Sequence, residues 1–322
     1  MNYGDLIKDA LWISWRNKYL WFFGFFVAGG YSFNFNLPSG NFDFKDFKSN
    51  DSSGAISSLA AWMGGNGSFP FVLIALIILV TLVLVIVFIA LSVISRGALA
   101  ESVAALKRGE TRRFGTAWRA GTSNAWRVLG QAILFFLIGL GLLLVVSLVV
   151  VLPFLLVFVL TQSLGTRIAA GVLLGLLGVV LLILVFLPLY IVGQLALRKL
   201  VVDGERIGGS IGSGYALFRA NLGKSLLTWL VFLGVSLGVG IAALIVFFIL
   251  GIVLIGPSIA LFIGNYTTAG IAAGIVGGLI FLVPFLVISG ALGTFGHAYW
   301  TLAYLQLTTP PDHPIAESGL ET

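Results

Sequence analysis

The sequence predicts an all-α integral membrane protein with six transmembrane helices. Four long stretches contain no Lys, Arg, Asp or Glu: residues 69–95, 128–166, 168–197 and 225–311. In addition, 59% of the 322 residues are hydrophobic and only 9% are charged, against about 25% charged in an average soluble protein. A soluble core of this size needs charge on its surface, whereas a lipid-facing helix excludes it. We therefore expect no ionisable side chain inside the spans.

The composition also limits the chemistry that the chain can perform. There is no Cys, so no thiol nucleophile or Cys-based metal site exists, and the only two His are His297 and His313. We expect no catalytic, cofactor-binding or metal-binding residue, and no enzymatic activity. The net charge of +6 comes from basic residues beside membrane segments, so nucleic acid is not expected as a partner.

The spans follow from the charge-free runs, taken in order. The first is short and begins far enough back for Arg16 and Lys18 to extend to the interface. The third and fourth spans lie in one long apolar region and form a hairpin. The fifth and sixth spans form a second hairpin in another such region. The expected limits are residues 19–30 (with a start near residue 11) and 70–95 for the first two spans, then 127–197 and 225–305 for the two hairpins.

Two of these apolar runs are too long for a single crossing. Residues 128–162 would form a helix of about 52 Å, against a hydrocarbon core of about 30 Å. Pro153 is the expected breakpoint there, and Gly256-Pro257 is the expected breakpoint in the fifth span. The short apolar pieces that follow, residues 154–160 and 258–264, are then either extracytoplasmic caps or re-entrant segments.

Basic residues orient the bundle, because cytoplasmic loops are enriched in Lys and Arg. Three residues, Lys45, Lys48 and Arg167, fall on one side, and fifteen fall on the other. We expect a multi-pass protein of the cytoplasmic (inner) membrane with both termini in the cytoplasm. The fifteen are Lys8, Arg16, Lys18, Arg96, Lys107, Arg108, Arg112, Arg113, Arg119, Arg127, Arg198, Lys199, Arg206, Arg219 and Lys224.

The two central basic loops are copies of each other. Residues 114–127 align without a gap on residues 211–224, which brings Trp118 onto Tyr215 and Asn124 onto Asn221. A weaker copy opens the chain, where one indel brings Asn17 onto Asn221. We expect three parallel repeats in one membrane domain, each an amphipathic helix followed by a hairpin. The units are residues 4–95, 110–197 and 205–305 within domain 1–308, with an extracytoplasmic loop at 31–68 and a flexible cytoplasmic tail at 309–322.

Each repeat begins with a helix that is apolar on one face and basic on the other. Such helices lie in the membrane interface, with aromatic rings at headgroup depth and Arg at lipid phosphates. The helix from Thr111 to Asn124 is the clearest example. The expected headgroup ligands are Arg112, Arg113, Arg119, Arg127, Arg206, Arg219 and Lys224, and the expected interface aromatics are Trp12, Trp15, Phe114, Trp118, Tyr215 and Phe218.

These loop patterns resemble those of a group of uncharacterised bacterial polytopic membrane proteins, similar to the membrane domain beside glycerophosphoryl diester phosphodiesterases. The resemblance covers roughly residues 85–300 and implies a membrane fold without an established catalytic role. The phosphodiesterase activity is not implied, because the sequence shows no Glu/Asp/His metal cluster. The motifs are Ala117-Trp118-Arg119-x-Gly121 and Val202-Asp203-Gly204-Glu205, followed by Gly212-x-Gly214-Tyr215-x-x-x-Arg219-x-Asn221.

Several polar and small residues admit two interpretations. Asp43, Asp46 and Asp51 in the long loop either bind a cation loosely or are simply solvated. His297 is either an interfacial side chain or a proton or metal site with Tyr299 or Tyr304. The glycines Gly270, Gly274 and Gly278 favour close helix packing, within the chain or against a partner. Ser92, Gly193 and Ser289 occupy similar repeat positions and either hydrogen-bond between helices or line a central path.

Three functions fit the sequence. The first is a non-enzymatic scaffold or accessory subunit that engages anionic membrane lipids and other membrane protein subunits. The second is a transporter or permease component for a neutral or amphiphilic substrate, with its path on the repeat axis. The third is a lipid-active enzyme that uses Glu101, Glu110, Asp203 or Glu205. We expect a filled axis, because the spans supply Leu, Val, Ile and Gly, and therefore expect the first function.

The orientation can be tested in this Cys-free chain by introducing single cysteines. We expect Arg108→Cys to resist a membrane-impermeant thiol reagent in whole cells and to react after lysis, and Lys48→Cys to react in both. Labelling of Arg108→Cys in whole cells, with Lys48→Cys protected, would reverse the assignment.

Overall fold

The computed structural model describes residues 1–32 and 69–308, and all regular secondary structure in these ranges is α-helical. Five helices have the length and apolar composition to cross a membrane, which confirms a multi-pass, all-α membrane protein. They are α4 (Phe69–Lys107), α5 (Phe114–Leu160), α6 (Leu164–Val201), α8 (Leu222–Ile263) and α9 (Thr267–Thr308). Three shorter helices are α1 (Tyr3–Arg16), α2 (Leu20–Ser32) and α7 (Ile207–Ala220).

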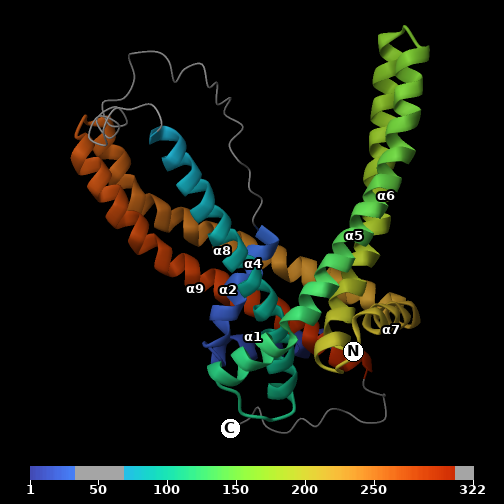
Figure 1. The fold of residues 1–322 in the computed structure, drawn as a ribbon, viewed down its shortest axis with the longest axis horizontal. Helices are drawn as coiled ribbons and strands as arrows, with labels where there is room; N and C mark the ends of the chain where they lie inside the picture. Colours follow the sequence, from blue (N-terminus) through green and yellow to red (C-terminus); the bar gives the residue numbers. More distant parts are fainter. Residues whose placement is uncertain (33–68, 309–322) are drawn as a thin grey trace.

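The helices form two long arms on a common base (Figure 1). The hairpins α5–α6 and α8–α9 are the arms, and they diverge from the base, where α1, α2, α7 and the adjoining ends of the long helices meet. Buried side chains such as Leu99, Leu195 and Tyr299 belong to the base, whereas the arms expose Leu144, Leu184 and many other large apolar residues. Such a distribution suits a bundle whose arms are solvated by lipid.

Proline does not interrupt the long helices, so the predicted breaks are wrong. Helix α5 runs through Pro153 for 47 residues, about 70 Å, and α8 runs through Pro257. Residues 154–160 and 258–264 are therefore neither caps nor re-entrant segments: they are the last turns of α5 and of α8 with its C-cap. Ending a helix in an apolar medium leaves several backbone groups unbonded, whereas a proline removes one hydrogen bond.

The first predicted span is also different. The chain breaks at Asn17, whose side-chain amide donates to the carbonyl of Ile13 (3.0 Å) and caps α1. The following helix, α2, has 13 residues and a length of about 20 Å, which is shorter than a hydrocarbon core of about 30 Å. The start near Leu11 is therefore wrong, and the described residues contain five candidate spans rather than six.

Two of the three predicted amphipathic helices are separate helices, and one is part of a longer helix. Helices α1 and α7 are separate from the helices that follow them, and Asn221 joins α7 to α8. The predicted helix from Thr111 to Asn124 is not separate: α5 begins at Phe114 and continues through Asn124 into the arm. In all three cases the asparagine amide donates to the carbonyl four residues earlier, on Ile13, Ala120 and Leu217.

The glycines of α9 pack on α8, mostly as predicted. A Cβ atom on Gly270 would contact Phe262, and one on Gly274 would lie 2.8 Å from Ser258 Oγ. Gly278 faces open space, and the neighbouring Gly277 instead sits against the carbonyl of Leu254. The close packing of Gly270 and Gly274 is therefore within the chain. Gly278 does not take part, because the turn of the helix brings Gly277, and not Gly278, onto the face that meets α8.

The tightest contact in the base joins α2 to α9, and it was not foreseen. A Cβ atom on Gly24 would collide with the backbone carbonyl of Gly290, and one on Gly293 would collide with that of Gly24. Thr294, one turn beyond Gly290, donates its hydroxyl to the carbonyl of Leu20 (3.0 Å) across the same contact. Backbones this close gain dispersion contacts and interhelical hydrogen bonds, which drive association where lipid offers no hydrophobic gain.

Gly24→Ala should therefore destabilise the protein. The new methyl group would collide with backbone atoms of Gly290 and Thr294 and with the Thr294 hydroxyl, so α2 and α9 must move apart, at a cost of about 1–3 kcal/mol. Gly240→Ala is the matched control, because a Cβ there meets nothing within 4 Å and alanine favours the helix. Thermal unfolding in detergent should show a lower midpoint for Gly24→Ala only. Equal midpoints would contradict the close packing.

Candidate functional site

The seven predicted headgroup ligands divide into two groups. Arg112 pairs with Glu110 (3.0 Å) and Glu101 (3.7 Å), and Arg127 donates to the carbonyls of Gly204 (2.7 Å) and Glu205. These two guanidinium groups tie the α4–α5 loop and the α6–α7 loop to the base. The other five side chains are exposed: Arg113, Arg119, Arg206, Arg219 and Lys224.

The α4–α5 loop carries a small ionic cluster at the surface. A hydrogen bond from Arg108 (3.0 Å) lowers the pKa of Glu110, and the bond from Arg112 acts in the same direction. A lowered folded-state pKa means that this contribution to stability is present above the usual Glu pKa and disappears as the pH falls through the lowered value. Because the carboxylate is fully exposed, the cluster orders the loop rather than stabilising the fold.

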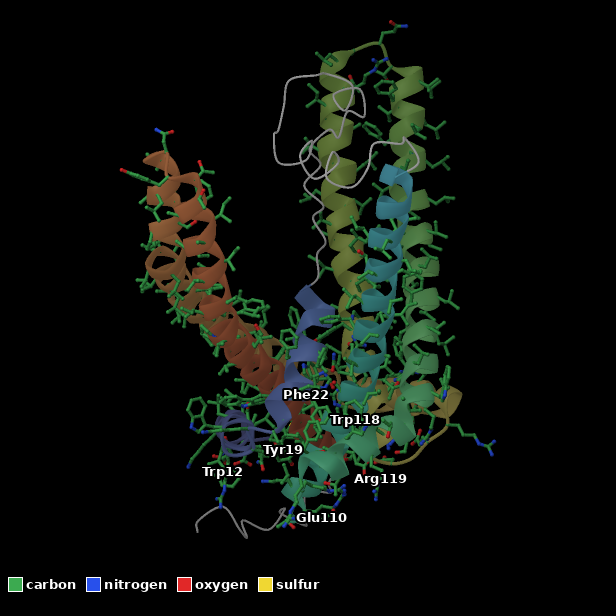
Figure 2. All side chains as sticks on the ribbon, turned by 60° about the vertical axis from the view of Figure 1, so that its left-hand side comes forward. Trp12, Tyr19, Phe22, Glu110, Trp118 and Arg119 are labelled. Carbon is green, nitrogen blue, oxygen red and sulfur yellow. The ribbon has the colours of Figure 1, made fainter. Side chains whose placement is uncertain are left out.

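The predicted interface aromatics are only partly at the surface. Phe114 and Trp118 stack with each other and on Phe23 of α2, with ring centroids 5.2–6.3 Å apart, and Figure 2 shows Trp118 beside Phe22. Phe218 is buried in the base, so its assignment to the interface is wrong. The remaining aromatics fit a surface better: Trp15 and Tyr215 are exposed, and Trp12 is half-buried under Arg16.

The base contains a partly open cavity, where the sequence predicted a filled axis. A cavity of about 610 Å³ lies between α2, α6, α8 and α9. We call it the larger chamber. Its volume falls in the ordinary range of ligand sites, about 300–1,000 Å³. Its lining residues are Phe25, Val27, Ala28, Tyr190, Gln194, Phe232, Ser236, Phe285, Ser289, Leu292, Gly293, Gly296, His297 and Trp300.

The walls of the larger chamber are mainly apolar, but two buried polar groups lie in its lining. His297 and Trp300 are 4% and 2% exposed, and neither His297 Nδ1 nor Trp300 Nε1 has a hydrogen-bond partner. Tyr299 and Tyr304 do not serve His297, because their hydroxyls donate to the Thr228 carbonyl (2.9 Å) and the Asp203 carboxylate (2.6 Å). Buried polar groups without partners are costly, so a ligand with polar atoms is favoured here.

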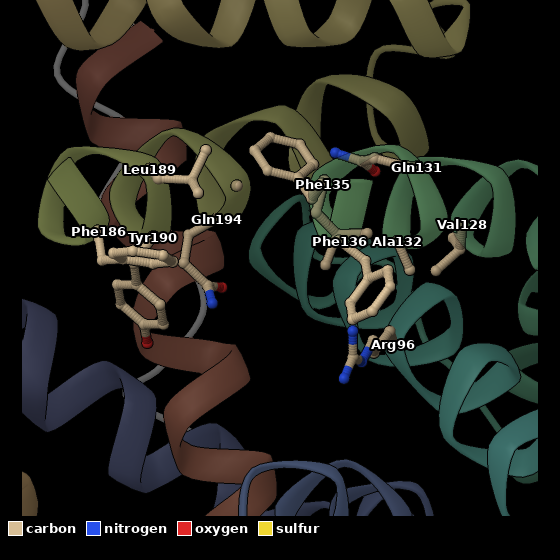
Figure 3. A pocket seen from close by; sticks show the side chains of 12 residues that line it. Arg96, Val128, Gln131, Ala132, Phe135, Phe136, Phe186, Leu189, Tyr190 and Gln194 are labelled. Atoms are coloured by element: carbon tan, nitrogen blue, oxygen red, sulfur yellow. The ribbon is translucent and has the colours of Figure 1, made fainter. Parts of the chain in front are cut away.

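A second cavity, of about 350 Å³, lies between α5 and α6, and α4 contributes Arg96 to its lining. We call it the smaller chamber. Figure 3 shows Arg96 and Gln194 on opposite sides of its open space, with Phe136 beside Arg96. Tyr190 and Gln194 line both chambers. Ser289 lines the larger chamber and Gly193 lines the smaller one, whereas Ser92 lines neither, so the three positions do not share one cavity.

Arg198 lies behind Gln194 and is fully buried. Its guanidinium donates to the carbonyl and the side-chain oxygen of Gln194 (2.8 and 2.5 Å), and more weakly to Thr301 Oγ1 and the carbonyl of His297 (both 3.4 Å). These bonds attach α6 to α9 and set the orientation of Gln194. A buried guanidinium with several acceptors is tolerated because its donors are satisfied.

The sequence interpretation missed Arg96 and Arg198 because it placed both in cytoplasmic loops. The structure places them inside α4 and α6, each directly after a charge-free run, residues 69–95 and 168–197, so the expectation of charge-free spans stays a prediction. A signal was available. Apolar residues continue at helical spacing beyond each arginine, at Leu99 and Val103 in α4 and at Leu200 and Val201 in α6.

No grouping of three or more His, Asp or Glu side chains that could hold a metal ion occurs in residues 1–32 and 69–308. The loop aspartates Asp43, Asp46 and Asp51 lie outside these ranges, as does the C-terminal tail.

Comparison with known proteins identifies a family but no function. Residues 15–311 match the model of a family of unknown function, DUF7544, and the chain belongs to this family. No curated protein and no solved structure matches the chain. The expectation of an uncharacterised membrane-protein family is thus supported, and no link to the membrane domain of the phosphodiesterases is shown.

Arg198→Met should destabilise the base. The change leaves the buried oxygens of Gln194 and Thr301 without this donor, at about 1–3 kcal/mol for each orphaned group. Arg219→Met is the matched control, because Arg219 is exposed and its loss should alter stability by less than about 0.5 kcal/mol. Thermal unfolding in detergent compares the two variants, and equal midpoints would show that the buried arginine is not structural.

Proposed function

We propose that the chain is a non-enzymatic transporter or permease component that holds an amphiphilic ligand in the larger chamber. The observation that supports this is a cavity of about 610 Å³ whose apolar walls include the buried, unpartnered polar groups of His297 and Trp300. An apolar site with a few convergent polar groups is the usual form of a small-molecule site. An amphiphile satisfies both parts of the lining at once.

The position of the larger chamber suits entry from the membrane. Its walls come from α6 on one side and from α8 and α9 on the other, and these helices belong to the two arms that diverge from the base (Figures 1 and 2). Their outward surfaces carry exposed leucine, isoleucine and valine, which are compatible with lipid. A ligand dissolved in the bilayer can therefore reach the base between the arms.

The proposed repeat gives this chamber its central location. In each unit an initial helix packs on the end of a long helix: α7 on α6, the start of α5 on α4, and α1 on α9. The pair α1 and α9 brings the first and last helices together, so the three units form a closed ring. The shared asparagine hydrogen bonds are consistent with the same duplication. We propose that the repeats surround the chambers, with both termini in the cytoplasm and the chain in the inner membrane.

A second candidate is a scaffold or accessory subunit that engages anionic lipids and other membrane subunits. Five exposed basic side chains support it: Arg113, Arg119, Arg206, Arg219 and Lys224. Each basic side chain at an anionic surface contributes about 1 kcal/mol. A scaffold binds lipid on its surface, whereas a transporter binds it inside the base, so the position of the bound lipid separates the two functions.

Filling the larger chamber should remove the ligand. Ser236→Trp places a large side chain in the lining, and overpacking of about 1–3 kcal/mol corresponds to a loss of binding of about tenfold or more. Leu237→Trp is the matched control, because this neighbouring side chain is 58% exposed on the outside of α8. Native mass spectrometry after mild detergent extraction counts the retained lipids. Equal retention by both variants would favour the scaffold.

A further inference from the structure

We propose that the ligand is an anionic phospholipid, with its phosphate head group in the smaller chamber against Arg96 and part of an acyl chain in the larger chamber. This inference rests on the proposed function and names its ligand. It assigns head-group binding to an internal arginine, whereas the sequence pointed to arginines of the surface loops.

The two chambers are suited to the two ends of one molecule. Tyr190 and Gln194 of α6 line both, so the two cavities adjoin the same turn of this helix. The larger chamber is bordered mostly by groups such as Phe25, Val27 and Phe285, and the smaller one contains Arg96. A lipid that occupied both spaces would have to displace the Tyr190 side chain, which packs on Trp300, and that of Gln194, which Arg198 holds (2.5 Å).

The electrostatics of the lining favour an anion. Among the residues that line the two chambers, Arg96 provides a guanidinium, and no Asp or Glu is present. A second guanidinium, that of Arg198, lies directly behind Gln194 at a hydrogen-bond distance of 2.5 Å. Interactions between charges strengthen where water is excluded, and an arginine fork matches the oxygens of a phosphate group.

The hydrogen-bonding capacity points to a ligand with acceptor oxygens. An indole Nε1–H can only donate, and that of Trp300 has no acceptor among residues 1–32 and 69–308. His297 Nδ1 lies in the same chamber lining without a partner. The ester carbonyl oxygens of a phospholipid sit between its phosphate and its chains, and so could reach these donors while the phosphate reaches Arg96.

Inorganic phosphate alone explains less of the site. It would satisfy the smaller chamber but would leave the apolar larger chamber, with Phe232 and Leu292 in its lining, without a function. A phospholipid accounts for both chambers, and anionic lipids are abundant in the cytoplasmic leaflet.

The test is native mass spectrometry of the full chain in nanodiscs of equal phosphatidylglycerol and phosphatidylcholine. We expect the wild type to retain phosphatidylglycerol about tenfold over phosphatidylcholine, which corresponds to one charge-assisted contact. Arg96→Gln should abolish the preference, and Arg96→Lys should keep part of it. Arg113→Gln is the control, because it removes the same charge from an exposed position. Thermal unfolding confirms that each variant is folded.

The outcomes separate this inference from the function on which it rests. If Arg96→Gln keeps the full preference while Ser236→Trp loses all lipid, the chamber binds an amphiphile but Arg96 does not select its head group. If neither change affects retention, both proposals fail. If Arg113→Gln alone abolishes the preference, the lipid is held at the surface. Displacement of phosphatidylglycerol by millimolar inorganic phosphate would identify a free phosphate site and overturn the lipid assignment.

Discussion

The structure depends on one constraint: an apolar medium offers no hydrogen bonds to the backbone, so a helix that enters it must continue until it leaves. Four prolines that would end helices in water, Pro153, Pro188, Pro257 and Pro284, lie inside unbroken helices. Each removes one donor, which is a smaller loss than the set of groups exposed by a helix end. The long arms follow directly from this rule, and so does the absence of any strand in the described residues.

Close backbone contact, rather than hydrophobic burial, holds the arms to the base. The side chains of the arms have no reason to leave lipid for one another, since lipid is as apolar as leucine. The described part of helix α2, Leu20–Ser32, packs through Gly24 against Gly290 and Gly293 of α9. Its next turn, with Phe25 and Ala28, becomes a wall of the larger chamber. The contact that stabilises the base thus also positions the chamber.

Some polar groups of the base connect helices and loops, and others line the two cavities. Arg198 has acceptors on α6 and α9 and joins the two helices, while Arg112 and Arg127 secure the loops. Arg96, His297 and Trp300 lie in the linings of the cavities. Buried polar groups reduce stability unless they are satisfied, and their presence at cavities is typical of sites that function by binding.

The sequence by itself determined the class of the protein, because charge-free runs of 27 residues or more, such as 69–95, have no other stable state. It also identified Gly270 and Gly274 as small residues suited to helix packing, and both lie against α8. It did not determine where helices end, because the cost of a break depends on the surrounding medium and not on proline alone. The tertiary structure decided which charges are internal: Arg96 and Arg113 were both predicted in the loop between the second and third spans, and only the packing of α4 against α5 and α6 places one at a cavity and leaves the other exposed.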